Sequence, residues 1–371
     1  MYKFTVALCF CFLLLCASVQ PLGIVCERIP ADTTPGDIKV TPSGKVNIVI
    51  HNPYSEVDFA VVHHYKANLH THTAESDGSS DPRDVIYHYH EPGEYDILAI
   101  TDHNKNTWPW SEWISERPAD SSASSEYYPD LGMLAISGNE LSIRHHRGSI
   151  LNDYSHGGFF FHMAFRYIQK QNGLSFFCHP GRYSHDAAWY QWFFDLYDDC
   201  IMGIEVYNQG DRYQSDRLLW DSINRDRNPD ELIWGFSNDD MHHIPNHAFR
   251  NYQHFLMNDL TEDEFKNAMR DGAFYFSYEP NGSVRENPTY GQAMAPRLLD
   301  VIVNETTITI TGDGIERYQW IDEQSHVICT DSTIDVATID SNFVRAVLLN
   351  EYGKTYMQPF GIELNNTTMP S

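Results

Sequence analysis

Cysteine, basic residues and membrane-length apolar runs are scarce in this sequence, and each scarcity excludes a class of protein. Seven cysteines in 371 residues are too few for a disulfide scaffold. Lysine and arginine number 25 against 51 acidic residues, which gives a formal net charge of −26. A chain this acidic repels polymeric nucleic acid unless a local basic patch or bound cations reverse the sign. We therefore expect no polymeric nucleic acid as a partner.

The longest apolar run lies at the N-terminus, where Lys3 precedes an unbroken stretch from Phe4 to Cys16. This stretch is shorter than the about 20 residues that cross a bilayer, and small residues follow it. Charged, apolar and small residues in this order are typical of an export signal. The sequence therefore predicts a signal peptide over residues 1–20, a secreted or extracytoplasmic protein and no other membrane contact. An uncleaved signal anchor is the alternative.

The aromatic and histidine content indicates what the rest of the chain can build. A hydrophobic content of 42%, with 22 Tyr, 20 Phe and 8 Trp, is enough for a globular interior. Of the 19 histidines, 18 lie between His51 and His254, and only His326 follows. Histidine chemistry therefore belongs to the first three quarters of the chain.

Short β-type runs alternate with helical patterns in this histidine-rich region, which is typical of βα units around a parallel sheet. A helix should begin at Pro82 after the N-cap Asp81, and another should begin after Thr261. The expected strands are 66–70, 96–100, 133–137, 174–178, 202–207 and 232–236.

The residue pattern changes after about residue 297, where runs of β-branched residues alternate with turns that contain glycine. This pattern predicts a small β-sandwich. The predicted organisation is a signal peptide (1–20), an N-terminal extension (21–65), an α/β domain (66–280), a linker (281–296) and the β-sandwich (297–371).

Side chains that bind metals follow several of the predicted strands. His70 and His72 are two residues apart on an extended strand, so both imidazoles can reach one cation. Asp77 lies in the next loop, and Asp102 and His103 end the second strand abruptly in polar residues. Either Asp102 or His103 could be structural rather than a ligand.

The later strands repeat this pattern. Glu140 follows the third strand and precedes His145 and His146, of which only one needs to coordinate; we favour His146. His179 enters a Pro-Gly turn, and Cys178 before it is interpreted as core packing. The last segment repeats the two-residue spacing of the first pair with Asp240 and His242 as its metal-binding residues. Asp239 could replace Asp240 as the ligand.

The ordered set His-X-His with Ser-Asp-Gly, then Thr-Asp-His, Gly-X-Glu, a histidine, His-Pro and Asp-X-His resembles the polymerase and histidinol phosphatase (PHP) family. The resemblance covers residues 66–280 and implies an α/β fold, a distorted (β/α)7 TIM-like barrel, which the small β-sandwich would follow. It implies two or three divalent ions, zinc, manganese or iron. One ion would be held by His70, His72, Glu140 and Asp240. Glu140 would bridge to a second at His146 and His179, and a third would lie at Asp77, His103 and His242.

The activity that this resemblance implies is hydrolysis of a phosphoester by a metal-activated water. Arg182 would neutralise phosphoryl charge, and His103 or His179 would help to protonate the leaving oxygen. The expected partner is a small phosphorylated substrate, a monoester or a nucleotide-type diester. The alternatives are an amidohydrolase that cleaves an amide or lactone, and a secreted protein that binds metal or glycan without catalysis.

Overall fold

The structure, a computed structural model, describes residues 46–282 and 294–366. The predicted signal peptide, the first part of the extension and most of the linker lie outside the described residues. None of the described helices is long and apolar enough to cross a membrane.

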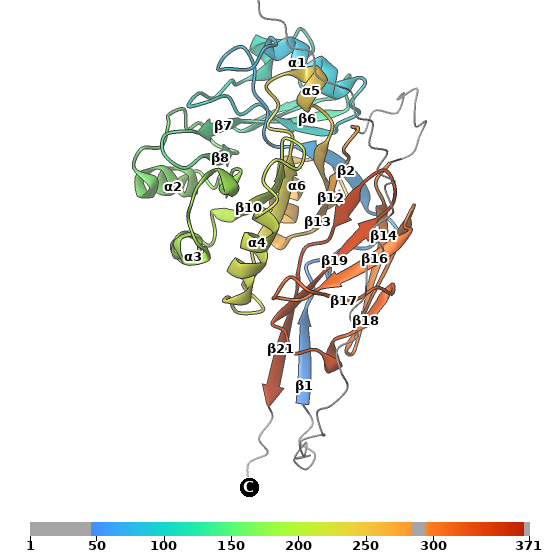
Figure 1. The fold of residues 1–371 in the computed structure, drawn as a ribbon. Coiled ribbons are helices and arrows are strands. Elements are labelled where there is room, and N and C mark those ends of the chain that lie inside the picture. The colour runs from blue at the N-terminus through green and yellow to red at the C-terminus, as the bar shows by residue number, and fades with distance from the viewer. Residues whose placement is uncertain (1–45, 283–293, 367–371) are drawn as a thin grey trace, which may run out of the picture. The chain divides into compact units, whose positions relative to one another are not determined.

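Thirteen strands join into one long sheet (Figure 1). Its main path is β1 (Val46–His51), β21 (Phe360–Asn366), β19 (Phe343–Leu349), β20 (Lys354–Tyr356), β13 (Phe274–Tyr278), β12 (Asn251–Met257), β2 (His63–Asn68), β3 (Ile97–Ala99), β6 (Met133–Ile136), β5 (Ser125–Tyr128) and β4 (Asp120–Ser121). A branch leaves β19 through β16 (Arg317–Ile321) and β17 (Val327–Cys329).

Two further sheets complete the strand content. The first has five strands in the order β11 (Trp234–Asn238), β10 (Ile201–Asn208), β9 (Leu174–Phe177), β8 (Arg147–Ile150) and β7 (Gly138–Leu141). The second has three strands, β14 (Arg297–Asn304), β15 (Thr307–Asp313) and β18 (Thr333–Asp335). A strand forms in every one of the six predicted ranges, which confirms these predictions.

The helices pack outside the strands. They are α1 (Pro82–His90), α2 (Phe161–Lys170), α3 (Ala187–Leu196), α4 (Asp216–Arg225), α5 (Ile244–His247) and α6 (Glu262–Asp271), with short 3-10 turns at Trp110–Glu112, Pro180–Arg182 and Val336–Thr338. Asp81 accepts a hydrogen bond from the Arg83 N–H, and Thr261 accepts one from the Glu264 N–H. Both predicted helix starts are therefore confirmed.

The two larger sheets share one buried interior, into which alternate side chains of their strands point. Ile97 and Ala99 of β3 lie in the same buried cluster as Phe176 of β9. Their neighbours Leu98 and Phe177 face outward, toward clusters that α1 and α2 complete. This inward and outward alternation is what a barrel-like interior requires.

The described strands form a mixed α/β fold without a continuous closed sheet, so the TIM-like barrel is not confirmed. Across the two sheets, the described strands pair through backbone only at two isolated parallel bridges, Thr71 with Met241 and His103 with Glu140, while their side chains pack in the shared interior. The reason lies in the strand directions. β7 and β8 pair antiparallel, and β12 pairs antiparallel with both β13 and β2. Hairpin pairing cannot continue the parallel ladder of a βα barrel.

The C-terminal strands form two β layers around a second core. Leu298 and Ile310 of the three-stranded sheet share a buried cluster with Trp320, Ala346 and Leu348 of the long sheet. β1, which precedes the α/β region, pairs along its length with β21. Residues from both ends of the described chain therefore build this part.

A buried ion pair joins the α/β region to the C-terminal strands. The Arg345 guanidinium donates to both carboxylate oxygens of Asp221, over 2.6 and 2.8 Å, and Ser325 donates to the same carboxylate over 2.7 Å. Asp221 lies on α4 and Arg345 on β19, and both side chains are buried. The pair therefore ties a helix of one part to a strand of the other.

Removing one partner of this pair should destabilise the protein. The variant Arg345→Met leaves Asp221 buried without its counter-charge, so we expect the free energy of unfolding to fall by about 3–5 kcal/mol. Urea denaturation measures the change. Arg225→Met removes the more exposed pair with Asp226 and should cost less than about 1 kcal/mol. Equal losses in the two variants would contradict the structural role of the buried pair.

Candidate metal centre

The predicted ligands converge on one cavity at the ends of strands from different parts of the chain. His70 follows β2, His103 follows β3 and His179 follows β9. The cavity measures about 600 Å³. Every predicted metal ligand belongs to one of several overlapping groups whose ligand atoms lie within 4.8 Å of one another: His70, His72, Asp77, His103, Glu140, His146, His179, Asp240 and His242.

Three of these residues form a triangle suited to a single cation. The Nε2 atoms of His70 and His72 lie 3.1 Å apart. Oδ1 of Asp240 lies 3.3 Å from the first nitrogen and 3.2 Å from the second. Ligands of a tetrahedral zinc ion at its usual bond lengths are about 3.3 Å apart. The residues present therefore fit a cation at this position.

Glu140 lies at the middle of the cluster. Its Oε1 is 2.9 Å from Nδ1 of His146, 3.1 Å from Nε2 of His179 and 3.3 Å from Nε2 of His70. Its Oε2 is 2.7 Å from Nδ1 of His103, but the pair lacks hydrogen-bond geometry and both atoms are buried without a partner. Buried polar atoms normally have partners, and a cation would provide one.

Electrostatics keep the buried carboxylates ready to bind cations. Burial opposes ionisation of Glu140 and Asp240, yet the surrounding imidazoles hold the pKa of both carboxyls well below the usual range. Both groups are therefore ionised at neutral pH, as metal ligands must be.

Asp77 completes a third group at the mouth of the cavity. Its carboxylate oxygens lie 3.4 Å from Nε2 of His103 and 3.3 Å from Nε2 of His242. The loop that carries Asp77 is pressed against the preceding strand end, because a Cβ at Gly78 would come within 2.6 Å of the His72 carbonyl. The glycine of the Ser-Asp-Gly motif is therefore needed to bring Asp77 back toward the histidines.

Glu205 is a functional residue that the sequence analysis missed. One of its oxygens lies 2.8 Å from Nδ1 of His70 and accepts from Asn238, and the other accepts from the His179 N–H over 2.8 Å. Such a carboxylate fixes the orientation and tautomer of a ligating imidazole. The signal was present, since Glu205 is an ionisable residue inside the largely apolar strand β10.

Several neighbours face away from the centre. Both ring nitrogens of His145 are engaged, with the His146 carbonyl and with Tyr190, at 2.8 Å each. Asp102 accepts from the backbone and hydroxyl of Thr73, which orders the following loop. The geometry therefore favours His146 over His145, and His103 over Asp102, as the ligand.

Asp239 and Cys178 are also interpreted as structural residues rather than as metal ligands. Asp239 accepts three backbone N–H groups, those of residues 249–251, and the Tyr89 hydroxyl. Burial raises the pKa of the Cys178 thiol well above its usual value, so the thiol stays protonated although it lies close to His70.

Two arginines line the same cavity. Arg182 follows His179 in a 3-10 turn, and Arg212, which the sequence analysis did not single out, lines the cavity as well. Gln209, His247 and Ser142 also line the wall. These arginines place fixed positive charge beside the histidine cluster.

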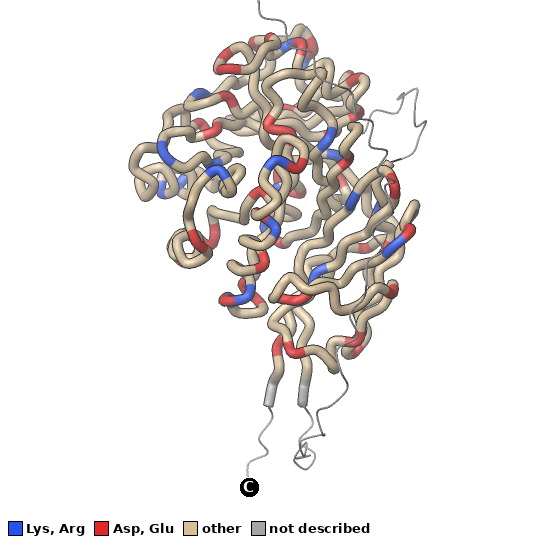
Figure 2. Tube along the Cα trace, in the orientation of Figure 1, with Lys and Arg blue, Asp and Glu red and all other residues tan. Residues whose placement is uncertain are grey.

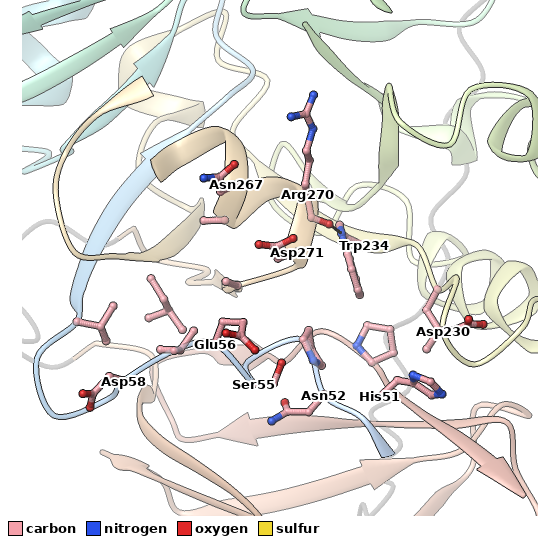
Figure 3. Close-up of a pocket in the computed structure, with 18 of the residues that line it drawn as sticks. His51, Asn52, Ser55, Glu56, Asp58, Asp230, Trp234, Asn267, Arg270 and Asp271 are labelled. Atoms are coloured by element: carbon pink, nitrogen blue, oxygen red, sulfur yellow. Dashed lines mark hydrogen bonds between the residues drawn. The ribbon is translucent and has the colours of Figure 1, made fainter. Parts of the chain in front are cut away.

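A separate cavity lies between the β1–β2 segment and α6 (Figure 3). Glu56, Asp58, Asp230 and Asp271 line it together with Arg270. None of the described metal-binding groups includes these residues. We therefore assign the candidate site to the histidine cavity.

No family model matches this chain, and no curated protein matches it. Among solved structures, it is similar to a two-domain protein from Bacteroides vulgatus containing a predicted PHP-like metal-dependent phosphoesterase, at 16% identity and a TM-score of 0.46 over 84% of this chain and 92% of that one. It is also similar to the lesion-specific endonuclease PfuEndoQ from Pyrococcus furiosus, at 15% identity and a TM-score of 0.42 over 64% of this chain and 62% of that one.

The family that the motifs resemble is thus found among the similar structures as well. Each of these TM-scores is below 0.5, so no activity is transferred from these proteins to this chain. Endonuclease Q, which is also similar at a TM-score of 0.40 over 56% of this chain and 57% of that one with 15% identity, was solved with a duplex substrate that carries an abasic lesion. That neighbour acts on DNA, in conflict with the exclusion of polymeric nucleic acid expected from the sequence, so the exclusion is not confirmed.

The adjacent aspartates should differ sharply in metal binding. Asp240→Asn removes an ionised ligand, so we expect affinity for zinc or manganese to fall at least about 100-fold. Asp239→Asn should leave metal affinity nearly unchanged, because the partners of Asp239 are backbone N–H groups and the Tyr89 hydroxyl. Metal titration calorimetry on the two purified variants measures both effects. Equal losses of affinity would contradict the assignment of Asp240 as the ligand.

Proposed function

We propose that this protein is a metal-dependent hydrolase of phosphoesters. The observation that carries the proposal is the convergence of six imidazoles and three carboxylates on one cavity that two arginines also line. Two or three divalent ions would outweigh the negative charge of the three carboxylates. The centre would then attract and hold an anionic phosphoryl group.

The ligand assignment follows the groups described above. His70, His72 and Asp240 would hold one ion with Glu140 beside it, and Glu140 with His146 and His179 would hold the second. Asp77, His103 and His242 would hold the third. Zinc suits the imidazoles, and manganese or iron suits the mixed oxygen and nitrogen set. Bound divalent ions supply a water of lowered pKa and neutralise phosphoryl charge.

The remaining residues position the substrate and move the proton. Arg182 can offer two parallel N–H donors to phosphoryl oxygens. His103 and His179 are the candidates to protonate the leaving oxygen, a role with which metal ligation by the same residue would compete. His103 is the better placed, because 22% of its side chain is exposed whereas His179 is buried at 3%.

We propose a small phosphate ester as the substrate. In the described part of the chain the basic residues are scattered among acidic ones, as Figure 2 shows, and form no extended positive track for a nucleic-acid backbone. A duplex with an abasic site is the competing substrate suggested by Endonuclease Q. The N-terminal pattern also leads us to propose that the protein is exported.

The metal centre should be required for phosphate release. We expect protein loaded with zinc or manganese to release phosphate from small phosphomonoesters, or to hydrolyse small phosphodiesters to a monoester and an alcohol. His72→Ala should lower kcat/KM at least about 100-fold, since it removes a ligand. His243→Ala, at the exposed neighbour of His242, is the control and should retain activity. Cleavage of an abasic duplex but of no small ester would contradict the proposed substrate class, and unchanged turnover by the His72 variant would contradict the mechanism.

Arg182 should act on substrate binding more than on metal binding. Arg182→Gln removes the charged donors, so we expect KM to rise about tenfold or more while metal content stays unchanged. Arg317→Gln, on the exposed surface of β16, provides the matched control. Steady-state kinetics with metal analysis of each variant tests this. An unchanged KM would contradict the role of Arg182 in substrate binding.

A further inference from the structure

A second cavity opens beside the metal centre and is rich in aromatic side chains. It measures about 730 Å³. Its walls come from the β7–β8 connection, the start of α2 and the start of α3. The residues that matter below are His145, Phe159, Phe160, Met163, Tyr183 and Trp189. The sequence motifs and the proposed chemistry leave this cavity without a role.

The outer wall exposes large apolar side chains. Phe159, Phe160 and Met163 are 48%, 65% and 68% exposed. Exposed apolar side chains that gather in one place commonly mark a binding surface, whereas scattered ones do not. These three residues are close in sequence and line the same cavity, so they form one patch.

The inner wall is built of stacked aromatic rings, of which His185 is exposed and His145 is buried. The rings of His185 and Trp189 stack at 3.9 Å with 7° between their planes, and His145 lies nearly parallel to Trp189 at 5.3 Å and 12°. Offset stacking against such faces is a preferred geometry for a further aromatic ring. The wall therefore suits a planar aromatic group.

Tyr183 connects this cavity to the metal centre. Its hydroxyl accepts a hydrogen bond from the His146 N–H over 3.1 Å, and its ring centroid lies 6.2 Å from that of His179. Its ring also stacks on His145 at 4.0 Å. Tyr183 is therefore a wall between the proposed ligands and the aromatic cavity.

The charged residues of this cavity suit an aromatic ligand that also carries negative charge. Its described lining contains Arg144 and three histidines but no aspartate or glutamate, in a chain with 51 acidic residues. A negatively charged molecule can therefore approach it without meeting a carboxylate in the wall.

We propose that this cavity, which we call the aromatic subsite, binds a planar aromatic group of the phosphoester substrate. The inference rests on the proposed function, because it takes the phosphoryl group to lie at the metal centre. Since Tyr183 stands between the two cavities, the aromatic group is joined to the phosphate through a spacer of several bonds.

Two matched phosphonates, which cannot be hydrolysed, test the subsite by binding alone. Propylphosphonate and 3-phenylpropylphosphonate share the anion and the spacer and differ only in the ring. Calorimetric titration of the manganese-loaded protein should show that the ring tightens binding about tenfold. Equal affinities for the two compounds would overturn the proposal.

The double variant Phe160→Ser with Met163→Ser locates the effect. It should abolish the gain from the ring and leave propylphosphonate binding unchanged, which also shows that the variant is folded. Ile302→Ser, at an exposed apolar residue of β14, is the control and should keep the full gain. A gain that survives in the double variant would overturn the proposal. So would a dimer of the natural protein, seen by light scattering, that dissociates in the double variant.

Phosphate release from propyl phosphate and 3-phenylpropyl phosphate separates this inference from the proposed function. A gain in phosphonate binding without hydrolysis of either monoester or of their methyl diesters would overturn the proposed function and support the aromatic subsite. Phosphate release from both esters without any gain in binding would support the proposed function and overturn the subsite.

Discussion

The site depends on one buried carboxylate surrounded by imidazoles. Glu140 has no exposed surface, and its two oxygens lie within 3.5 Å of nitrogens from five histidines. An ionised carboxylate in such a place is stable only if positive charge or strong donors compensate the lost hydration. Bound cations would do this for Glu140 and for Asp240 together. The polar interior is therefore understandable as a metal site and hard to account for as a packed core.

The interruption of the sheet and the position of the site have a common cause. Between the two larger sheets, the described backbone forms β-bridges only at Thr71–Met241 and His103–Glu140, and each bridge lies next to or within the cluster. At these points the strands end and their side chains turn inward rather than continue a ladder. Glu205, one strand away, then fixes His70 and the backbone of His179 from behind. The frame thus holds the ligands in place through hydrogen bonds as well as through packing.

Much of this could be predicted from the sequence because it depends on local patterns. His-X-His spacing, apolar strands that end in polar residues and the N-caps Asp81 and Thr261 each act over a few residues. The interruption of the barrel could not be predicted, because it depends on strand pairing. The pair β7–β8 is antiparallel, and the order of apolar and polar residues does not distinguish such a hairpin from a βα unit. Glu205 was missed although a carboxylate inside a buried strand is a signal, because its contacts with His70 and His179 form only once β10 lies beside β9. The aromatic subsite likewise gathers residues from the β7–β8 connection and from the starts of α2 and α3.

The most direct test of the central claim is an anomalous diffraction measurement on crystals grown with manganese or zinc. We predict anomalous peaks at two or more positions, one bounded by His70, His72 and Asp240 and another in contact with Glu140. A protein that takes up metal and shows its peaks only at other places, such as the acidic cavity near Asp271, would contradict this account.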